Sequence, residues 1–278
     1  MNPLMITAAC GQAKPPRKNA EPDSVADVVE SVVRAARAGA AIAQIRAPSK
    51  PHPVTGRPQT DIARWIEMVS RIRDACDIVI HAGTAAMEVE ARIEMLERVR
   101  PDIASFLVNH HGIVVRGMEH ASLRTRTDSI RLLEGHKATG VLPDFEIFHA
   151  GSVRNFEFVL KETGFSNTHA LTLFFGWDGG EWSPPTVEEF LHRLQAIPRD
   201  AHYSITVAGP EQVLMHTLAI SRGGHVRGGL GDYAFWRDGI PWRDSAHFVE
   251  CACRIADEVG RAVATPQDAR RILGIPGA

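Results

Sequence analysis

Short runs of apolar and β-branched residues alternate along the chain with longer segments in which apolar residues recur every three or four positions. Each run predicts a buried strand and each longer segment an amphipathic helix. The pairing repeats about eight times, which is typical of parallel strands joined by crossover helices and predicts a closed (β/α)8 barrel of the TIM type. The expected strands cover residues 4–9, 41–45, 78–81, 103–108, 145–148, 170–175, 203–207 and 226–229.

Helix-start signals accompany several of the expected helices. Asp23 or Ser24 is a candidate N-cap for the first helix. Thr265 before Pro266 predicts a short C-terminal helix at about 265–273, which would close the bottom of the barrel or pack against the first helix. The other expected helices cover residues 25–38, 61–74, 88–99, 119–134, 153–162, 187–194, 211–222 and 245–260.

Length and composition favour a single domain over residues 1–278. With 44% hydrophobic residues the chain can bury one large core, and barrels of about 250 residues form one domain. The 31 basic residues nearly balance the 33 acidic ones, so the overall charge favours neither nucleic acid nor an anionic membrane as a partner. The apolar runs are short and no signal-peptide pattern opens the chain, so we expect a cytoplasmic protein.

Polar side chains gather where the expected strands end, and catalytic groups of such barrels come from these ends and the loops that follow. The first two loops are basic although the chain has no net positive charge. They suit an anion, such as a carboxylate or the phosphates of coenzyme A, while a solvated surface is the ordinary explanation for part of them. The residues at these two strand ends are Cys10, Gln12, Lys14, Arg17, Lys18, Gln44, Arg46, Lys50, His52 and Arg57.

Later strand ends carry histidines and acids. Imidazoles at His81, His110, His111 and His149 are possible metal ligands, but no two have the i, i+2 spacing that aims both into a barrel. The glycines of the RGGLGD segment after the last strand can approach a phosphate or simply form a tight turn. The other polar residues at these ends are Thr84, Asn109, Glu146, Arg227 and Asp232.

Six segments together resemble one known family. They are MITAAC, AARAGAAIAQIRAP, LPDFEIFHAGSVRN, YSITVAG, GGHVRGGLGD and GRAVATPQDARRILGI, and they follow one another along nearly the whole chain. In this order they resemble the β-keto acid cleavage enzymes of the 3-keto-5-aminohexanoate cleavage type. The resemblance implies a zinc-dependent barrel, assembled as a symmetric homo-oligomer, that exchanges an acyl group between a β-keto acid and acetyl-CoA.

The residues at the family's metal positions differ from those the resemblance implies. There the family has two histidines at i and i+2 and a later glutamate, whereas this chain has Gln44, Arg46 and Gly231. None of the three is a credible zinc ligand, because an amide binds weakly, a guanidinium stays protonated and glycine has no side chain. Lys14 likewise stands where the family has a glutamate. Three further family positions are kept, as Arg227, Asp232 and Glu146.

The leading hypothesis is an enzyme, an acyltransferase or lyase, that cleaves or forms a carbon–carbon bond in a small β-keto acid without the inherited zinc site. Acetyl-CoA is its implied co-substrate. One alternative is a catalytically silent barrel that binds a small acid, and another is an enzyme with a relocated metal site made by His81, His110 and His149. The candidate catalytic residues are Arg227, Asp232, Glu146 and Arg46.

The candidate substrate-binding residues are Lys14, Gln44, Thr84, Asn109, His110 and His149. Arg46 offers a fixed positive charge that can polarise a carbonyl or bind a carboxylate. Lys14 can form a Schiff base if its pKa is low, or merely attract an anion. Four tryptophans are expected to line the pocket or to seal a subunit contact, namely Trp177, Trp182, Trp236 and Trp242.

Overall fold

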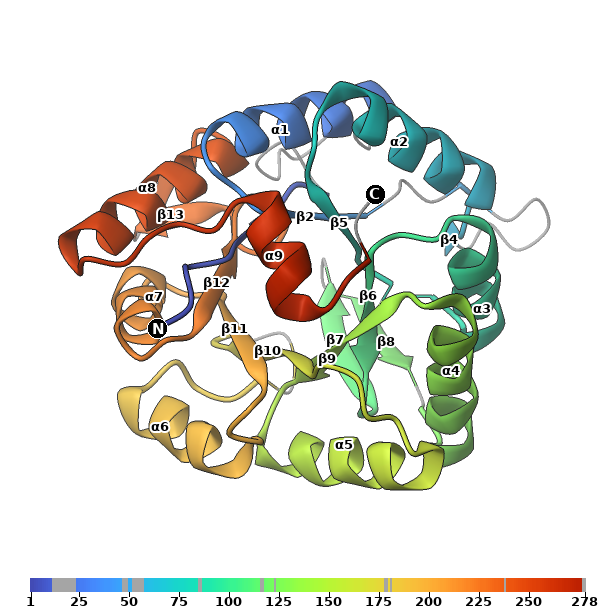
Figure 1. Ribbon diagram of the computed structural model, residues 1–278. Helices are drawn as coiled ribbons and strands as arrows, with labels where there is room; N and C mark the ends of the chain where they lie inside the picture. Colours follow the sequence, from blue (N-terminus) through green and yellow to red (C-terminus); the bar gives the residue numbers. More distant parts are fainter. Residues whose placement is uncertain are drawn as a thin grey trace.

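The computed structural model shows a closed barrel of parallel strands ringed by helices (Figure 1). Within the described residues each strand pairs in parallel with the next around the barrel, and β1 closes the ring by pairing with β12. The predicted (β/α)8 fold is therefore confirmed. The barrel strands are β1 (Ile6–Ala9), β2 (Ile42–Ile45), β5 (Val79–Ala82), β6 (Ile103–Leu107), β9 (Leu142–Ile147), β10 (Ala170–Phe175), β11 (His202–Val207) and β12 (His225–Gly228). The structure describes residues 1–11, 24–46, 50–51, 58–84, 87–115, 118–122, 124–177, 180, 182–237 and 239–276.

The helices of the outer ring begin where the sequence places polar caps. Ser24 and Asp27 form a reciprocal capping box at the first helix, and the Asp61 side chain accepts from the Arg64 backbone N–H at the second. None of the described helices is long and apolar enough to cross a membrane. The helices are α1 (Val25–Arg37), α2 (Ile62–Ala75), α3 (Val89–Arg98), α4 (Arg126–Thr139), α5 (Ala150–Thr163), α6 (Val187–Ala196), α7 (Gln212–Ser221) and α8 (Ser245–Glu258).

The prediction of a helix over 119–134 was wrong for the first half of that segment. Strands β7 (His111–Val115) and β8 (Met118–Ser122) form an antiparallel hairpin there, and α4 begins only after a capping box between Thr125 and Asp128. In this box the Thr125 side chain accepts from the backbone N–H of Asp128, and the Asp128 side chain accepts from the backbone N–H of Thr125. The free N–H groups of the first helical turn are thereby satisfied at this start. Two smaller hairpins follow other strands, formed by β3 (Lys50–Pro51) with β4 (Pro58–Gln59) and by β13 (Phe235–Arg237) with β14 (Ile240–Pro241).

The C-terminal helix α9 (Pro266–Leu273) closes the N-terminal end of the barrel (Figure 1). Its buried face, with Ala269, Ile272 and Leu273, packs on the first inward-facing residues of the strands, such as Met5 and Ile103. A capping box at Thr265 starts it, as the sequence predicted. The sequence predicted that this helix closes the barrel bottom or packs against the first helix, and closure of the barrel bottom is confirmed. The opposite end of the barrel, where the strands end, is therefore the place to look for a site.

Polar side chains occupy the barrel interior above this plug. Because residues two apart on a strand face the same side, Asp144 and Glu146 of β9 both face the interior, and each is about 95% buried. Arg227 of β12 and Thr206 of β11 are buried in the same way. Interiors of such barrels are usually filled by branched apolar residues, so these buried charges need specific partners.

Candidate active site

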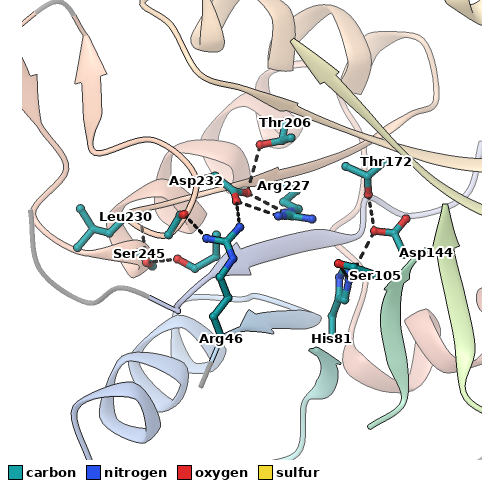
Figure 2. Close-up of polar contacts among 12 residues, drawn as sticks. Arg46, His81, Ser105, Asp144, Thr172, Thr206, Arg227, Leu230, Asp232 and Ser245 are labelled. Carbon is teal, nitrogen blue, oxygen red and sulfur yellow. Dashed lines mark hydrogen bonds and ion pairs between the residues drawn. The ribbon is translucent and has the colours of Figure 1, made fainter. Parts of the chain in front are cut away.

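The RGGLGD segment folds back on itself at the C-terminal end of β12. Gly229 has φ +123°, a conformation that favours glycine. The backbone N–H groups of Asp232 and Tyr233 both donate to the Gly229 carbonyl, 3.1 and 3.0 Å away. The Ser245 hydroxyl accepts from the Leu230 N–H and donates to the Ala9 carbonyl (Figure 2). This turn brings the Asp232 carboxylate within hydrogen-bond distance of Arg227.

The carboxylate of Asp232 is the centre of a buried ionic cluster (Figure 2). Arg227 donates to it twice, from Nε at 2.7 Å and from Nη2 at 2.8 Å. Thr206 Oγ1 donates to Oδ2 and Arg46 Nη2 to Oδ1, both at 3.2 Å. The side chains of Arg227 and Asp232 are 2% and 3% exposed, whereas Arg46 is 39% exposed at the barrel mouth.

These partners keep the carboxylate ionised. Burial raises the pKa of Asp232, but the Arg227 guanidinium, with its hydrogen bonds and with Arg46, outweighs burial and holds the pKa at about 2. Arg46 is the more exposed of the two guanidiniums. An anionic or electron-rich ligand that reaches the mouth would therefore meet this positive charge first.

Arg46 connects two distant parts of the chain. It lies just after β2, and its Nη1 donates to the Gly231 carbonyl at 2.6 Å while Nη2 reaches Asp232. These are the strand ends from which the family resemblance draws its metal ligands. A guanidinium therefore spans the two strand ends that a metal ion would have joined.

Gln44, two residues before Arg46, is fully buried, and both its amide atoms lack a hydrogen-bond partner among the described residues. Its amide lies over Gly83, where an added Cβ would stand only 2.1 Å from Gln44 Nε2 and 3.0 Å from Arg46 Cγ. Glycine at 83 is thus what gives the Gln44 amide its place beside Arg46. An unpaired buried amide costs about 1–3 kcal/mol, so this amide is suited to a ligand or a water molecule.

A second polar group lies beside this cluster in the barrel interior (Figure 2). Asp144 accepts from Thr172 Oγ1 at 2.7 Å, and His81 Nε2 lies 3.2 Å from Ser105 Oγ and 3.6 Å from Asp144 Oδ2. Burial raises the pKa of Asp144 to about 7, against the lowering effect of Arg227. Burial and Arg227 lower the pKa of His81 well below 6.5, so His81 is neutral at pH 7.

The raised pKa of Asp144 predicts a pH effect on stability. Folded protein keeps this proton up to a pH of about 7, whereas the unfolded carboxyl releases it near its ordinary pKa of 3.8. The group therefore lowers the free energy of unfolding as the pH rises through this window. Asp144→Asn cannot ionise but still accepts from Thr172. Its unfolding free energy relative to wild type should increase between pH 5 and pH 8 in urea titrations, and parallel pH curves for the two proteins would contradict the pKa assignment.

The other candidate residues are dispersed around the mouth. Thr84 Oγ1 donates to the Ser105 carbonyl at 2.9 Å and is buried. Asn109 Nδ2 lies 3.2 Å from His149 Nε2, and the exposed His110 accepts from the Arg124 backbone N–H through Nδ1 at 3.0 Å. Several residues of the two basic loops lie outside the described residues, namely Gln12, Lys14, Arg17, Lys18, His52 and Arg57.

The described part of the chain does not assemble the relocated histidine site. His81, His110 and His149 each have a different neighbour, respectively Ser105, Arg124 and Asn109. Among the described residues, no three His, Cys, Asp or Glu side chains are grouped in a way that could hold a metal ion. The three histidines are therefore better described as separate hydrogen-bonding residues.

Aromatic residues make an apolar wall next to Arg227. The Phe174 ring lies 5.3 Å from the Arg227 guanidinium carbon, and Trp182 packs against it with ring centroids 4.7 Å apart. Trp177 contacts Trp182 in turn, at 5.2 Å. The other tryptophan pair, Trp236 and Trp242, packs on His247 of α8 instead. Trp182 therefore belongs to the wall beside Arg227, and the second pair packs against α8.

Several residues of the site were missed by sequence reasoning. Four of them lie inside strands, whereas the residues predicted from the sequence come from strand ends and the loops that follow. These four are Thr206, Asp144, Ser105 and Thr172. The signal was present in the alternation of β9, where acids at 144 and 146 interrupt an apolar strand. Such acids on the inward side of a buried strand indicate a polar barrel interior.

The residues present do not fit the zinc that the family resemblance implies. Zinc in proteins takes three or four N, S or O donors, whereas here Arg46 presents a cation, Gly231 only a backbone carbonyl already bound by Arg46, and Gln44 a weak amide oxygen. A second cation next to a fixed guanidinium is repelled. This donor set argues against a metal at the inherited position.

Elemental analysis tests this conclusion directly. Protein purified without added metal should contain far less than one zinc per chain, and chelation should leave ligand binding intact. Stoichiometric zinc held near Gln44 would contradict the donor argument. Zinc removed by mutation of His81, His110 or His149 would instead support the relocated site.

Fold and site together define a (β/α)8-barrel protein with a buried arginine–aspartate centre at the carboxyl ends of its strands. The chain belongs to the β-keto acid cleavage enzyme family, whose sequence model matches residues 3–275. It is 29% identical to the 3-keto-5-aminohexanoate cleavage enzyme of Acetoanaerobium sticklandii, over 99% of each chain. It is 25% identical to the 3-oxoadipate:acetyl-CoA acetyltransferase of Cupriavidus necator, over 99% of this chain and 95% of that one.

Solved structures support the fold independently of sequence. The binary complex of ObcA with oxaloacetate superposes with a TM-score of 0.71 at 17% identity, covering 92% of this chain and 67% of that chain. At this identity the likeness extends to the barrel alone.

Proposed function

We propose that this protein cleaves small β-keto acids by exchanging their acyl group with acetyl-CoA. In this reaction the bond between the keto carbon and the neighbouring CH2 of the β-keto acid breaks, its acyl group joins the CoA sulfur, and the acetyl group joins the released CH2–carboxylate. The products are a new acyl-CoA and acetoacetate, so atoms and charge balance. Family membership and the acetyl-CoA-dependent relative from Cupriavidus necator support the proposal.

The observation that carries it is the buried pair of Arg227 and Asp232, joined by Arg46 at the barrel mouth. Asp232 is ionised and firmly oriented, so it can accept a proton from the carbon between the keto and carboxylate groups. Arg46 is exposed enough to bind the substrate's carboxylate or carbonyl oxygen. In this proposal Glu146 and the described substrate-binding candidates, Gln44, Thr84, Asn109, His110 and His149, complete the polar side of the site, and Lys14 stays a candidate from the sequence alone.

The same geometry also favours a second candidate, a silent barrel that binds a small acid. The Asp232 carboxylate accepts four hydrogen bonds from Arg227, Arg46 and Thr206, and a carboxylate whose pKa is about 2 is a weak base. Incubation with a panel of β-keto acids and acetyl-CoA, followed by assay of acetoacetate and acyl-CoA, separates the two. Turnover supports the enzyme, and binding without turnover supports the silent barrel.

We propose two further properties, a symmetric homo-oligomer, which the family resemblance implies, and a cytoplasmic location, which is the expectation from the sequence pattern. The keto acid and acetyl-CoA are the small-molecule ligands in this proposal. Sedimentation velocity gives the oligomeric state, and a single species at the mass of one chain would contradict the first of these.

A further inference from the structure

Arg46 keeps part of its hydrogen-bonding capacity for a ligand. A guanidinium has five N–H groups, and within the described residues Arg46 uses one for the Gly231 carbonyl and one for Asp232. These two bonds fix its plane between the ends of β2 and β12. With its side chain 39% exposed at the mouth, the other N–H groups can meet a ligand oxygen.

Gln44 adds a second, independent observation. Its amide is fully buried and lacks a partner among the described residues, and Gly83 holds the space in which it lies beside Arg46. The Gln44 NH2 group thus lies beside the Arg46 side chain near its Cγ, so an oxygen atom that enters between the two side chains would meet a neutral and a charged donor. Both residues stand at positions where the family resemblance implies metal ligands.

From these contacts we infer that Arg46 and Gln44 form a metal-free oxyanion site for the carbonyl oxygen of a β-keto acid. The inference rests on the proposed function and specifies how that function proceeds here. When Asp232 takes the proton from the carbon between the two carbonyl groups, the C–H electron pair forms a C=C bond and the π pair of the keto C=O bond moves onto its oxygen. The guanidinium and amide stabilise that charge, and because arginine does not deprotonate in proteins, the site stays cationic over the working pH range.

Chemical rescue of Arg46→Ala is the decisive experiment. Removal of one oxyanion donor typically costs about 100- to 1000-fold in turnover, so we expect at least a 100-fold loss of kcat/KM for acyl exchange with acetyl-CoA. Millimolar guanidinium or methylguanidinium should restore activity at least tenfold and saturably, whereas ammonium and zinc should not. Rescue by zinc, or activity unchanged in Arg46→Ala, would overturn the inference.

Two variants test whether the Gln44 amide contributes to the oxyanion site. Gly83→Ala places a methyl where the Gln44 amide lies, and Gln44→Leu removes the amide. Both should lower kcat/KM at least tenfold without changing far-UV circular dichroism. Gly135→Ala is the matched control, because its added methyl lies in ordinary contact, 3.5 Å from Leu96 and away from the site, and it should keep full activity. Full activity in Gln44→Leu would remove Gln44 from the site.

Measurements of ligand binding distinguish a failure of the oxyanion-site inference from a failure of the proposed enzymatic function. If wild-type protein turns over no β-keto acid, calorimetry with acetoacetate still decides the site. Binding that is weakened at least tenfold in Arg46→Ala and regained with methylguanidinium supports the oxyanion site. Equal affinity in the two proteins, or no binding to wild type, overturns it.

Discussion

Asp232→Asn is expected to lower kcat by about 100- to 10,000-fold, the usual contribution of a positioned base. The amide keeps the shape of the side chain but cannot accept a proton. In wild type the pKa of about 2 means that Asp232 is ionised at every working pH. Steady-state kinetics at pH 7 measure the loss, and the kcat/KM of wild type should show no acidic limb from Asp232 above about pH 4.

The structure changes how this experiment must be controlled. The Asp232 carboxylate is buried against Arg227, whose side chain is only 2% exposed, so Asp232→Asn is expected to lower the melting temperature as well. Removing one partner of a buried pair costs about 3–5 kcal/mol. Turnover must therefore be measured well below the melting temperature, with the folded fraction verified.

Thr206→Val is the matched comparison for Asp232→Asn. It removes one hydrogen bond to the same carboxylate but keeps both charges, so it should cost about 0.5–1.5 kcal/mol of stability and far less turnover. Turnover in folded Asp232→Asn equal to that of Thr206→Val would eliminate Asp232 as the general base.

The fold was predictable because hydrophobic periodicity is local information. The strand at 170–175 has the predicted bounds, and Thr265 before Pro266 marked the last helix. The error at 119–134 arose where a β-hairpin interrupts the βα repeat. Apolar spacing in a short segment suits a hairpin or a helix equally well, and only the capping box at Thr125 and Asp128 distinguished them.

Only those contacts of the site that join residues close in sequence were predictable from local patterns. Arg227 and Asp232 are five residues apart, so the glycine turn between them indicated their contact. The bond from Arg46 to Gly231 joins residues 185 apart in sequence, and it depends on β1 lying between β2 and β12. The Asp144–Thr172 contact likewise depends on the β9–β10 register, which local patterns do not encode.

Arg227→Met is expected to lose about 3–5 kcal/mol of stability at pH 7.5. The variant buries the Asp232 carboxylate with only the more exposed Arg46 and Thr206 as partners. Burial is the largest influence on the pKa of Asp232 and raises it, so without Arg227 that pKa should lie above its ordinary value. Urea denaturation at pH 7.5 measures the loss against wild type.

The pH dependence of this loss identifies its cause. In wild type the low pKa of Asp232 stabilises the folded state at every pH above about 4, and this contribution is lost only as the pH falls toward 2. In Arg227→Met the raised pKa makes the folded state bind a proton that the unfolded state releases, so its stability falls as the pH rises. The gap between the two proteins should therefore be smaller at pH 4.5 than at pH 7.5.

The double variant Arg227→Met with Asp232→Asn completes the test of this buried charge. With both charges removed there is no unpaired carboxylate at position 232, and a neutral pair of similar volume is often as stable as a buried ion pair. The double variant should thus be more stable than either single variant at pH 7.5 and should lack the part of the pH dependence of Arg227→Met that comes from Asp232. Additive losses in the double variant would mean that Arg227 stabilises the barrel by packing on Phe174 rather than through its charge.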